Sequence, residues 1–198
     1  MAARKLTFVT GNTNKAKELA AILANTEGSS GWSVETLELD LPELQGDPEE
    51  VSREKCLLAV KEVNGPVIVE DTSLCFNAMG GLPGVYIKWF LDKLGHGGLN
   101  QMLVGFTDKT AYAQCVFSYC AAPGAEVKTF AGRTHGAIVP PRGDNQFGWD
   151  PVFECLDPEL EGHADFGKTY AEMSKDTKNL VSHRARAFNA LASYLRDN

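Results

Sequence analysis

Acidic residues at predicted loop and strand-end positions are the first candidates for chemistry in this sequence. Glu43 lies in a predicted loop, and Glu70 and Asp71 directly follow a short apolar run. Mg²⁺ binds carboxylate oxygens and usually takes only one or two of them from the protein, with water and substrate phosphate as its other ligands. A lone loop carboxylate is more often a solvated charge, so the pattern favours a functional role for Asp71 but not for Glu43 alone.

Four lysines at separated positions could neutralise the charge of a polyphosphate. Each phosphoryl group of a triphosphate needs positive charge near it, and its transfer is catalysed mainly by positioning and electrostatics. The lysines serve that purpose only if the fold brings them together, and any one of them alone is more often a solubilising surface charge. They are Lys15, Lys55, Lys88 and Lys178.

The turn at residues 10–15, with the sequence Thr-Gly-Asn-Thr-Asn-Lys, is a candidate anion site. It follows an apolar strand-like run from Lys5 to Val9 and leads into a helical pattern, so it directs backbone N–H groups and the positive end of a helix at one point. Its spacing matches neither the phosphate loop G-x-x-x-x-G-K-[ST] nor the dinucleotide motif G-x-G-x-x-G. Gly and Asn also end strands for ordinary turn reasons, so the turn alone is a weak indication.

The segment from Phe147 to Asp150 could bind a planar base. A base could stack on one of its aromatic rings while the carboxylate accepts hydrogen bonds from ring N–H groups. A second interpretation is equally open, in which Trp149 is a core residue and Asp150-Pro151 makes a turn. Residues 182–184, Ser-His-Arg, add donors at the start of the last predicted helix, but no G-x-S-x-G motif supports a hydrolytic triad.

The composition is that of one globular domain. The chain has 198 residues, of which 43% are hydrophobic and 23% charged, enough to bury a substantial core. Its net charge of −7 and pI near 5.1 argue against binding a nucleic-acid backbone as the main activity. No stretch predicts a signal peptide or a membrane span, so we expect a soluble intracellular protein, located in the cytoplasm.

Cysteine and histidine spacing gives no metal or disulfide pattern. The five cysteines are an odd number without a C-x-x-C pair, so we expect reduced and mostly buried thiols. His96, His135 and His163 share no spacing typical of metal ligands.

The elements that must position these residues can be read from hydrophobic periodicity. A helix follows the first turn, and a half-buried strand is expected at Trp32–Leu39. The next helix is expected to begin at Asp47 or Pro48 and to be stopped by Gly65. The apolar stripes of these two helices are Ala16, Leu19, Ala20 and Leu23 in the first, and Cys56, Ala59, Val60 and Val63 in the second.

The second half of the chain predicts further strands and two helices. A buried strand at Pro66–Val69 is expected to end in Glu70-Asp71-Thr72, the position at which open α/β sheets bind ligands. We also expect a helix-like segment at Tyr86–Leu94, a hairpin formed by 111–121 and 127–139, and a last helix from about Asn179. The acidic stretch Glu154–Gly167 predicts a mobile loop.

Seven segments together closely resemble the inosine triphosphate pyrophosphatase family, in order over nearly the whole chain. Each motif is modest, but the ordered set is specific, and residues 80–90 resemble the eukaryotic branch. The segments are Thr10-Gly11-Asn12 with Lys15, Leu41-Pro42-Glu43, Ser52 to Lys55, Glu70 to Leu74, Gly80 to Phe90, Phe147 to Pro151, and Ser182-His183-Arg184.

The resemblance implies a Mg²⁺-dependent enzyme, with Mn²⁺ as a possible substitute, that hydrolyses ITP, dITP and XTP to the nucleoside monophosphate and pyrophosphate. Such an enzyme removes deaminated purines from the nucleotide pool. The resemblance further implies a homodimer, and a single domain at residues 1–198 with an α/β fold. That fold would have a long, mixed, twisted sheet with flanking helices and two lobes around a central nucleotide cleft.

Site residues follow from the resemblance at matching positions. Glu43 and Asp71 would bind the metal, and Asp71, Lys15 and Glu43 would be catalytic, with Asp71 able to orient or deprotonate the attacking water. The substrate-binding set would be Thr10, Gly11, Asn12, Thr13, Asn14, Lys15, Lys55, Asp71, Thr72 and Lys88 for the phosphate side, and Phe147, Gly148, Trp149, Asp150, Lys178, His183 and Arg184 around the base.

The sequence differs from the family pattern in one stretch, and two alternative functions remain open. The stretch Glu154–Gly167 is longer than the resemblance leads us to expect; it could alter specificity, although a passive surface insertion is favoured. One rival is a phosphohydrolase of the same fold that acts on other modified nucleotides, and the other is a nucleotide-binding module without catalysis. The retained carboxylates and Lys15 argue against the second rival.

Overall fold

The computed structural model describes residues 4–13, 15–17, 19, 32–144 and 147–197. The helices are α2 (Pro48–Val63), α3 (Ile87–Gln101), α4 (Lys175–Val181) and α5 (His183–Asp197). Short 3₁₀ turns lie at Asn77–Met79, Asp150–Val152 and Pro158–Leu160. The strands are β1 (Arg4–Val9), β2 (Trp32–Leu37), β3 (Val67–Phe76), β4 (Pro83–Gly84), β5 (Thr110–Cys120), β6 (Lys128–Ile138) and β7 (Phe153–Cys155).

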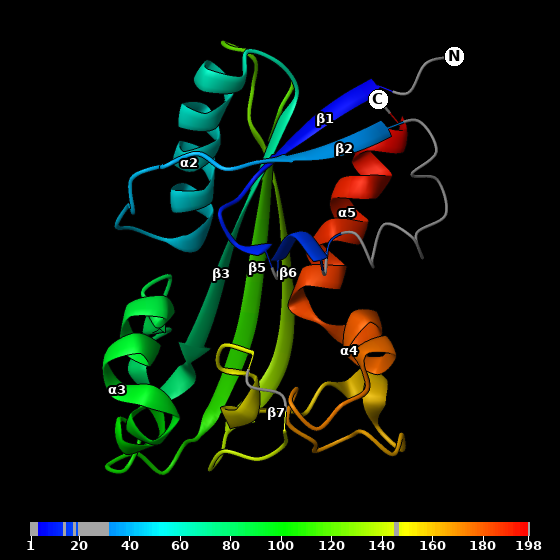
Figure 1. Cartoon of the computed structure of the whole chain (residues 1–198). Coiled ribbons are helices and arrows are strands. Elements are labelled where there is room, and N and C mark those ends of the chain that lie inside the picture. Colours follow the sequence, from blue (N-terminus) through cyan, green and yellow to red (C-terminus); the bar gives the residue numbers. More distant parts are fainter. Residues whose placement is uncertain (1–3, 14, 18, 20–31, 145–146, 198) are drawn as a thin grey trace. The chain divides into compact units, whose positions relative to one another are not determined.

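The described strands form a mixed sheet in the order β2-β1-β3-β5-β6-β7, with β4 paired to β3 (Figure 1). Strand β1 is parallel to both β2 and β3, whereas the β3–β4 and β6–β7 pairs are antiparallel. The predicted mixed α/β sheet with flanking helices is therefore confirmed.

The chain packs as two compact units. Unit 1 comprises Met1–Asp71, Cys115–Gly132 and Arg184–Asn198, and unit 2 comprises Thr72–Gln114 and Arg133–His183. Strands β3, β5 and β6 contribute residues to both units. The assignment of 1–198 to one domain stays a prediction.

In unit 1, two helices cover opposite faces of the strands. Val67 and Val69 of β3 share a cluster with residues of α2, whereas Ile68 between them shares a cluster with residues of α5. Alternate side chains of a strand point to opposite faces, so α2 and α5 lie on different sides of this part of the sheet (Figure 1). The buried stripes are Cys56, Ala59 and Val60 in α2, and Ala185, Phe188, Leu191 and Leu195 in α5.

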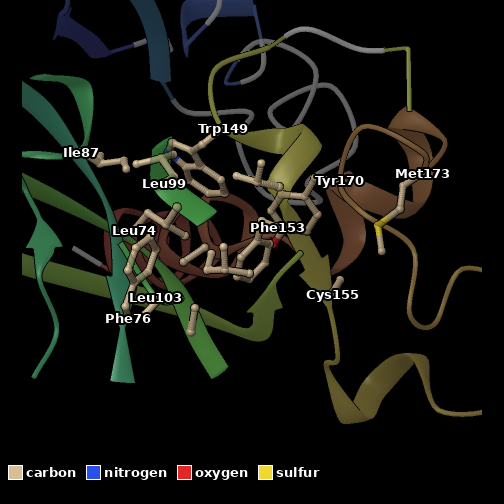
Figure 2. Close-up of a cluster of buried hydrophobic side chains, with 14 of the residues drawn as sticks. Leu74, Phe76, Ile87, Leu99, Leu103, Trp149, Phe153, Cys155, Tyr170 and Met173 are labelled. Carbon is tan, nitrogen blue, oxygen red and sulfur yellow. The ribbon is translucent and has the colours of Figure 1, made fainter. Parts of the chain in front are cut away.

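Unit 2 has a core of its own. Leu74 and Phe76 at the end of β3 pack with Leu99 and Leu103, at and just beyond the end of α3, and with aromatic residues from the segment after β6 (Figure 2). Helix α3 is longer than the predicted segment, because a second helical stretch follows Leu94. Gly95 lies between the two stretches with φ 66°, a left-handed conformation that favours glycine.

Two predicted boundaries were wrong. Strand β3 does not end at Glu70 but continues to Phe76, because both carboxylates are paired with cations and the apolar residues that follow them are buried. The parallel β1–β3 ladder nevertheless ends at Val9–Val69, so the carboxylates do follow its last residue pair. Helix α2 is ended by Asn64, which has a left-handed φ of 52°, and not by Gly65.

The C-terminal region and the acidic stretch also differ from the prediction. The single helix expected from about Asn179 is two helices, separated by Ser182 in an extended conformation. The stretch Glu154–Gly167, predicted to be a mobile loop, is not a loop throughout: it contains the end of β7 and a 3₁₀ turn, and Leu160 is buried in the unit 2 core. Its ends are joined by backbone hydrogen bonds between Cys155 and residues 167–168.

Two expectations from composition can be compared with the described residues. All five cysteines are reduced and buried, and burial raises the pKa of the Cys56 thiol to about 12. Within the described parts of the chain, no helix is long and apolar enough to cross a membrane. Ala20 and Leu23 of the first predicted helix lie outside the described residues, while Thr13, residues 15–17 and Leu19 are helical.

Candidate functional site

The turn at residues 10–15 connects β1 to a helix, as predicted. Asn12 caps this helix: its side-chain Oδ1 accepts from the Lys15 backbone N–H at 3.2 Å. The Thr10 hydroxyl accepts from the Asn12 backbone N–H at 3.1 Å. Two backbone N–H groups that could bind an anion therefore already donate to side chains of the turn. The positive charge that the turn contributes is that of Lys15.

Lys15 is directed toward Glu70. Its Nζ lies 3.0 Å from Glu70 Oε2 and 3.4 Å from the Glu70 carbonyl oxygen. On its other side, Glu70 Oε1 lies 3.4 Å from an Arg184 guanidinium nitrogen, and the Cys115 thiol donates to the same oxygen at 3.2 Å. The Glu70 side chain is 0% exposed, so a fully buried carboxylate holds two cations in unit 1.

A second charge cluster in unit 1 has the opposite composition. Lys55 Nζ lies 3.0 Å from Asp71 Oδ1 and 3.2 Å from Glu43 Oε2, so one lysine holds two carboxylates. Burial alone would lower the pKa of Lys55, but the charge and hydrogen bonds of Asp71 and Glu43 outweigh it and raise that pKa. Burial raises the pKa of Asp71, with Lys55 and Lys15 opposing the shift.

The two carboxylates of this cluster fit a hard divalent cation. Asp71 Oδ2 is buried, and no hydrogen-bond partner reaches it among the described residues. Burying an ionised oxygen without a charged or hydrogen-bonding partner costs free energy, and a bound cation would be such a partner. Mg²⁺ usually takes only one or two carboxylates from a protein, and Glu43 and Asp71 would be such a pair.

In unit 2, Asp150 and Lys178 form a buried ion pair. Lys178 Nζ lies 2.6 Å from Asp150 Oδ2, and the side chains are 9% and 4% exposed. The same ammonium lies 4.8 Å from the centre of the Phe147 ring and 5.2 Å from that of Tyr170, which are cation–π distances. Ser174, whose hydroxyl accepts from the Thr177 backbone N–H, caps α4 and thereby fixes the helix that carries Lys178.

Trp149 is a core residue, so the second sequence interpretation is confirmed for this side chain. It is 8% exposed and lies 5.5 Å from the Phe153 ring, 5.5 Å from His183 and 6.2 Å from Tyr170, centre to centre. Figure 2 shows Trp149, Phe153 and Tyr170 in the same buried cluster. Phe147, by contrast, is partly exposed and is the aromatic ring of this segment that a ligand could reach.

A side chain of α3 contacts the backbone of the Phe147–Asp150 segment. Gly148 has φ 55°, a left-handed conformation that glycine tolerates best. His96 Nε2 lies 2.7 Å from the Gly148 carbonyl oxygen. The Asp150 backbone N–H donates to the Phe147 carbonyl at 3.0 Å, and the Val152 N–H donates to the Trp149 carbonyl at 3.0 Å, which closes the predicted turn at Asp150-Pro151. His96 is therefore a side-chain contact to the Phe147–Asp150 segment.

The predicted site residues thus fall into two groups. Unit 1 brings together Lys15 and Arg184 around Glu70, and Glu43, Lys55 and Asp71 around each other. Unit 2 brings together Phe147, Trp149, Asp150, Lys178 and His183. Thr72 and Lys88 belong to unit 2, where Lys88 Nζ lies 5.6 Å from the ring centre of its neighbour Trp89. Gly11 and Thr13 are exposed members of the turn, and Asn14 lies outside the described residues.

Three residues of these clusters were not in the predicted site. Glu70 was considered only as one of several acidic residues, although two adjacent carboxylates in an apolar strand are a signal that charge partners are needed. The Tyr170 ring contacts both the Trp149 and the Lys178 side chains, and no local pattern indicated it. His96 is flanked by glycines, and only the hydrogen bond to Gly148 reveals its position.

The mixed sheet with helices on its faces defines an α/β protein, in which unit 1 carries paired charge clusters and unit 2 carries a buried ion pair next to aromatic rings. The model of the Ham1 family matches residues 6–194, and the chain belongs to this family. The inosine triphosphate pyrophosphatase of Fusarium vanettenii is 50% identical over 197 residues, covering 100% of this chain and 99% of the relative. That of Tuber melanosporum is 52% identical over 190 residues, covering 96% of both chains.

Solved structures agree with this membership. The Staphylococcus aureus Ham1 protein superposes with a TM-score of 0.79 at 29% identity, covering 98% of this chain and 99% of that one. A nucleoside-triphosphatase, dITP/XTP pyrophosphatase, from Mycobacterium abscessus has a TM-score of 0.71 at 27% identity, covering 96% and 99%. The fold expected from the sequence is thus shared with experimental structures of the family.

Proposed function

We propose that this protein is a Mg²⁺-dependent pyrophosphatase that hydrolyses ITP, dITP and XTP to the nucleoside monophosphate and pyrophosphate. The observation that carries the proposal is the convergence of Glu43 and Asp71 on Lys55, because adjacent carboxylates and a lysine suit a metal-bound polyphosphate. The names of the two fungal relatives support ITP as the substrate, and that of the mycobacterial protein supports dITP and XTP.

The reaction is the hydrolysis of an acid anhydride. A water oxygen forms a bond to the α-phosphorus, the bond from that phosphorus to the bridging oxygen breaks, and pyrophosphate leaves with the bonding electron pair. Asp71 accepts the proton of the attacking water.

Positive charge on the leaving side comes from lysines of unit 1. Lys15 and Lys55 neutralise the oxygens on which charge develops as pyrophosphate departs. Both are already fixed by carboxylates, so little side-chain freedom is lost when the phosphates bind. Thr10 and Asn12 contact the phosphates from the turn, and Lys88 adds a further positive charge.

Glu43 and Asp71 would hold Mg²⁺, with Mn²⁺ as a possible substitute. The bound ion supplies positive charge to phosphate oxygens, in addition to that of the lysines. The buried Oδ2 of Asp71 is the atom of this pair that lacks a hydrogen-bond partner among the described residues.

The choice of base follows from the donors available to it. Lys178, His183 and Arg184 favour the 6-oxo group of hypoxanthine or xanthine. The 6-amino group of adenine would face these donors with its own N–H groups and leave them unpaired, which costs binding energy. Phe147 provides a ring for the base to stack on.

A substrate panel tests the proposal. The protein is incubated with Mg²⁺ and ITP, XTP, dITP, GTP, ATP or dUTP, and orthophosphate is measured with and without added inorganic pyrophosphatase. Signal from ITP, dITP and XTP that depends on the added enzyme, and that disappears with EDTA, is the expected result. Orthophosphate formed directly from ITP would refute the cleaved bond, and preference for dUTP would indicate the same-fold rival. Absence of turnover would favour the binding module.

Two further properties belong to the proposal. A homodimer is expected from the resemblance, and light scattering of the purified protein would detect it. A cytoplasmic location is expected as well, and fractionation of cells that express the protein would test it.

A further inference from the structure

Glu70 is the most completely buried charged side chain of the unit 1 clusters, and neither the metal nor the proton-transfer role requires it. We infer that Glu70 is a positioning residue that holds Lys15 and Arg184 in place, and thereby links the rate of phosphate cleavage to the choice of base. The inference rests on the proposed function, because Lys15 contacts the phosphates and Arg184 the base in that proposal.

The geometry gives each carboxylate oxygen its own cation. Oε2 lies 3.0 Å from Lys15 Nζ, and Oε1 lies 3.4 Å from Arg184 Nη2. The Glu70 carbonyl oxygen accepts a second contact from Lys15 Nζ at 3.4 Å. Lys15 is thus held by both the side chain and the main chain of one residue of β3, a strand paired along its first residues with β1.

Because the Glu70 carboxylate is buried, it needs these contacts with cations. The Glu70 side chain is 0% exposed, that of Arg184 is 4% exposed, and that of Lys15 is 19% exposed. A buried carboxylate is tolerated only when cations or hydrogen-bond donors surround it. The Cys115 thiol, which donates to Oε1 at 3.2 Å, adds a neutral contact on the same side as Arg184.

A role for Glu70 as a metal ligand is less consistent with these contacts. Both of its oxygens lie within 3.4 Å of cations of the protein, whereas the ion pair of Asp71 with Lys55 uses Oδ1, and the buried Oδ2 of Asp71 has no hydrogen-bond partner among the described residues. Adjacent residues of a strand point to opposite faces. Glu70 and Asp71 therefore form ion pairs with different partners: Glu70 pairs with Lys15 and Arg184, and Asp71 pairs with Lys55.

Holding both cations has a functional consequence. Lysine and arginine side chains have many rotamers, and fixing them before the ligand binds lowers the cost of using them. Because one carboxylate fixes both, its loss would misplace the phosphate contact and the base contact together. The rate with ITP and the discrimination between ITP and ATP should then fall in the same variant.

The variant Glu70→Gln tests this inference. ITP and ATP are supplied together in one reaction, so that the ratio of the two products gives the ratio of kcat/KM values. This ratio does not depend on how much of the protein is folded, and a merely structural defect leaves it unchanged. In Glu70→Gln the ITP to ATP ratio should fall by about tenfold or more, and kcat/KM for ITP should also fall.

Two other variants complete the test. Glu70→Asp keeps the charge and should recover part of the selectivity. Glu35→Gln makes the same chemical change in unit 1, at an exposed pair where Lys5 Nζ lies 2.6 Å from Glu35, and should keep the wild-type ratio. A wild-type ratio in Glu70→Gln would overturn the inference, as would equal loss in Glu70→Gln and Glu70→Asp.

A binding measurement separates this inference from the proposed function. Calorimetric titration in EDTA, which stops the proposed Mg²⁺-dependent turnover, gives the ratio of the dissociation constant for ATP to that for ITP. If the wild-type protein binds ITP more tightly than ATP but hydrolyses neither, the proposed function fails while a lower ratio in Glu70→Gln still supports the role of Glu70. If the wild-type protein hydrolyses ITP and the variant keeps both ratios, only the role of Glu70 fails.

Discussion

The two units stabilise their charge clusters in different ways. In unit 1, charges pair with charges: Glu70 holds Lys15 and Arg184, and Lys55 holds Asp71 and Glu43. In unit 2, the Lys178–Asp150 pair is enclosed by the rings of Phe147 and Tyr170. The first environment suits a ligand that brings several negative charges. The second suits a flat, largely neutral group, because aromatic faces provide contact area and few donors.

The largest expected effect is the loss of the enclosed pair in unit 2. Lys178→Ala leaves the Asp150 carboxylate buried without its cation, which should lower the free energy of unfolding by about 3–5 kcal/mol in urea titrations. The matched control is Lys168→Ala, because Lys168 lies at the same 2.6 Å from Asp165 but is 42% exposed. The control should cost less than about 1 kcal/mol. Equal losses in the two variants would contradict the importance of enclosure.

The second-largest effect is expected from removing a carboxylate that pairs with Lys55 in unit 1. Glu43→Ala or Asp71→Ala should lower kcat for ITP by roughly 100-fold or more, which corresponds to about 2.7 kcal/mol of transition-state stabilisation. Circular dichroism and urea titration would show that each variant still folds. Near-normal turnover in both variants would refute their assignment as metal ligands.

A smaller effect is expected from His96, which contacts the segment that carries Phe147. His96→Ala removes the hydrogen bond to the Gly148 carbonyl and should raise KM for ITP by about fivefold, with kcat nearly unchanged, because one such bond contributes about 1 kcal/mol. His96→Gln offers a donor of similar reach and should recover part of the loss. His163→Ala, in the acidic stretch, should keep the wild-type KM. A change in kcat alone would argue against positioning of the base.

The smallest effect concerns an exposed charge of unit 2. A hydrogen bond from the Thr169 backbone N–H, aided by Arg142, lowers the pKa of Glu172 below its usual value of 4.5. The ionised form thus stabilises the fold above the unfolded pKa, and this contribution is lost as the pH falls through the folded pKa. Glu172→Gln should therefore flatten the loss of stability below about pH 4.5, as measured by thermal unfolding across acidic pH. An unchanged acid profile would contradict this.

Local patterns predicted most of the elements because each depends on neighbours in sequence. The strand before residue 10, the helix after Asp47 and the two long strands of the hairpin all lie within a few residues of their expected positions. Errors arose where charge interrupted an apolar pattern. Glu70 and Asp71 were predicted to end a strand, but Arg184 and Lys55, which lie on other elements of the fold, pair with them and allow the strand to continue.

Trp149 and the last helix illustrate the same limit of local patterns. The segment around Trp149 fits a stacking site and a core turn equally well by sequence, and packing against Phe153, Tyr170 and His183 decides for the core. The apolar spacing from Val181 to Leu195 hides a break at the extended Ser182, because Val181 packs in the unit 2 core whereas Ala185, Phe188 and Leu195 pack in the unit 1 core.

The sequence by itself determined the residue types, their order and the family: a turn with Lys15, paired carboxylates, and an aromatic segment before the final helices. Only the tertiary structure decided which charges share a partner. Glu70 meets Lys15 across 55 positions of the chain and Arg184 across 114. No local pattern encodes such a pairing, since it depends on how strands and helices pack and on the cost of burying any charge that remains unpaired.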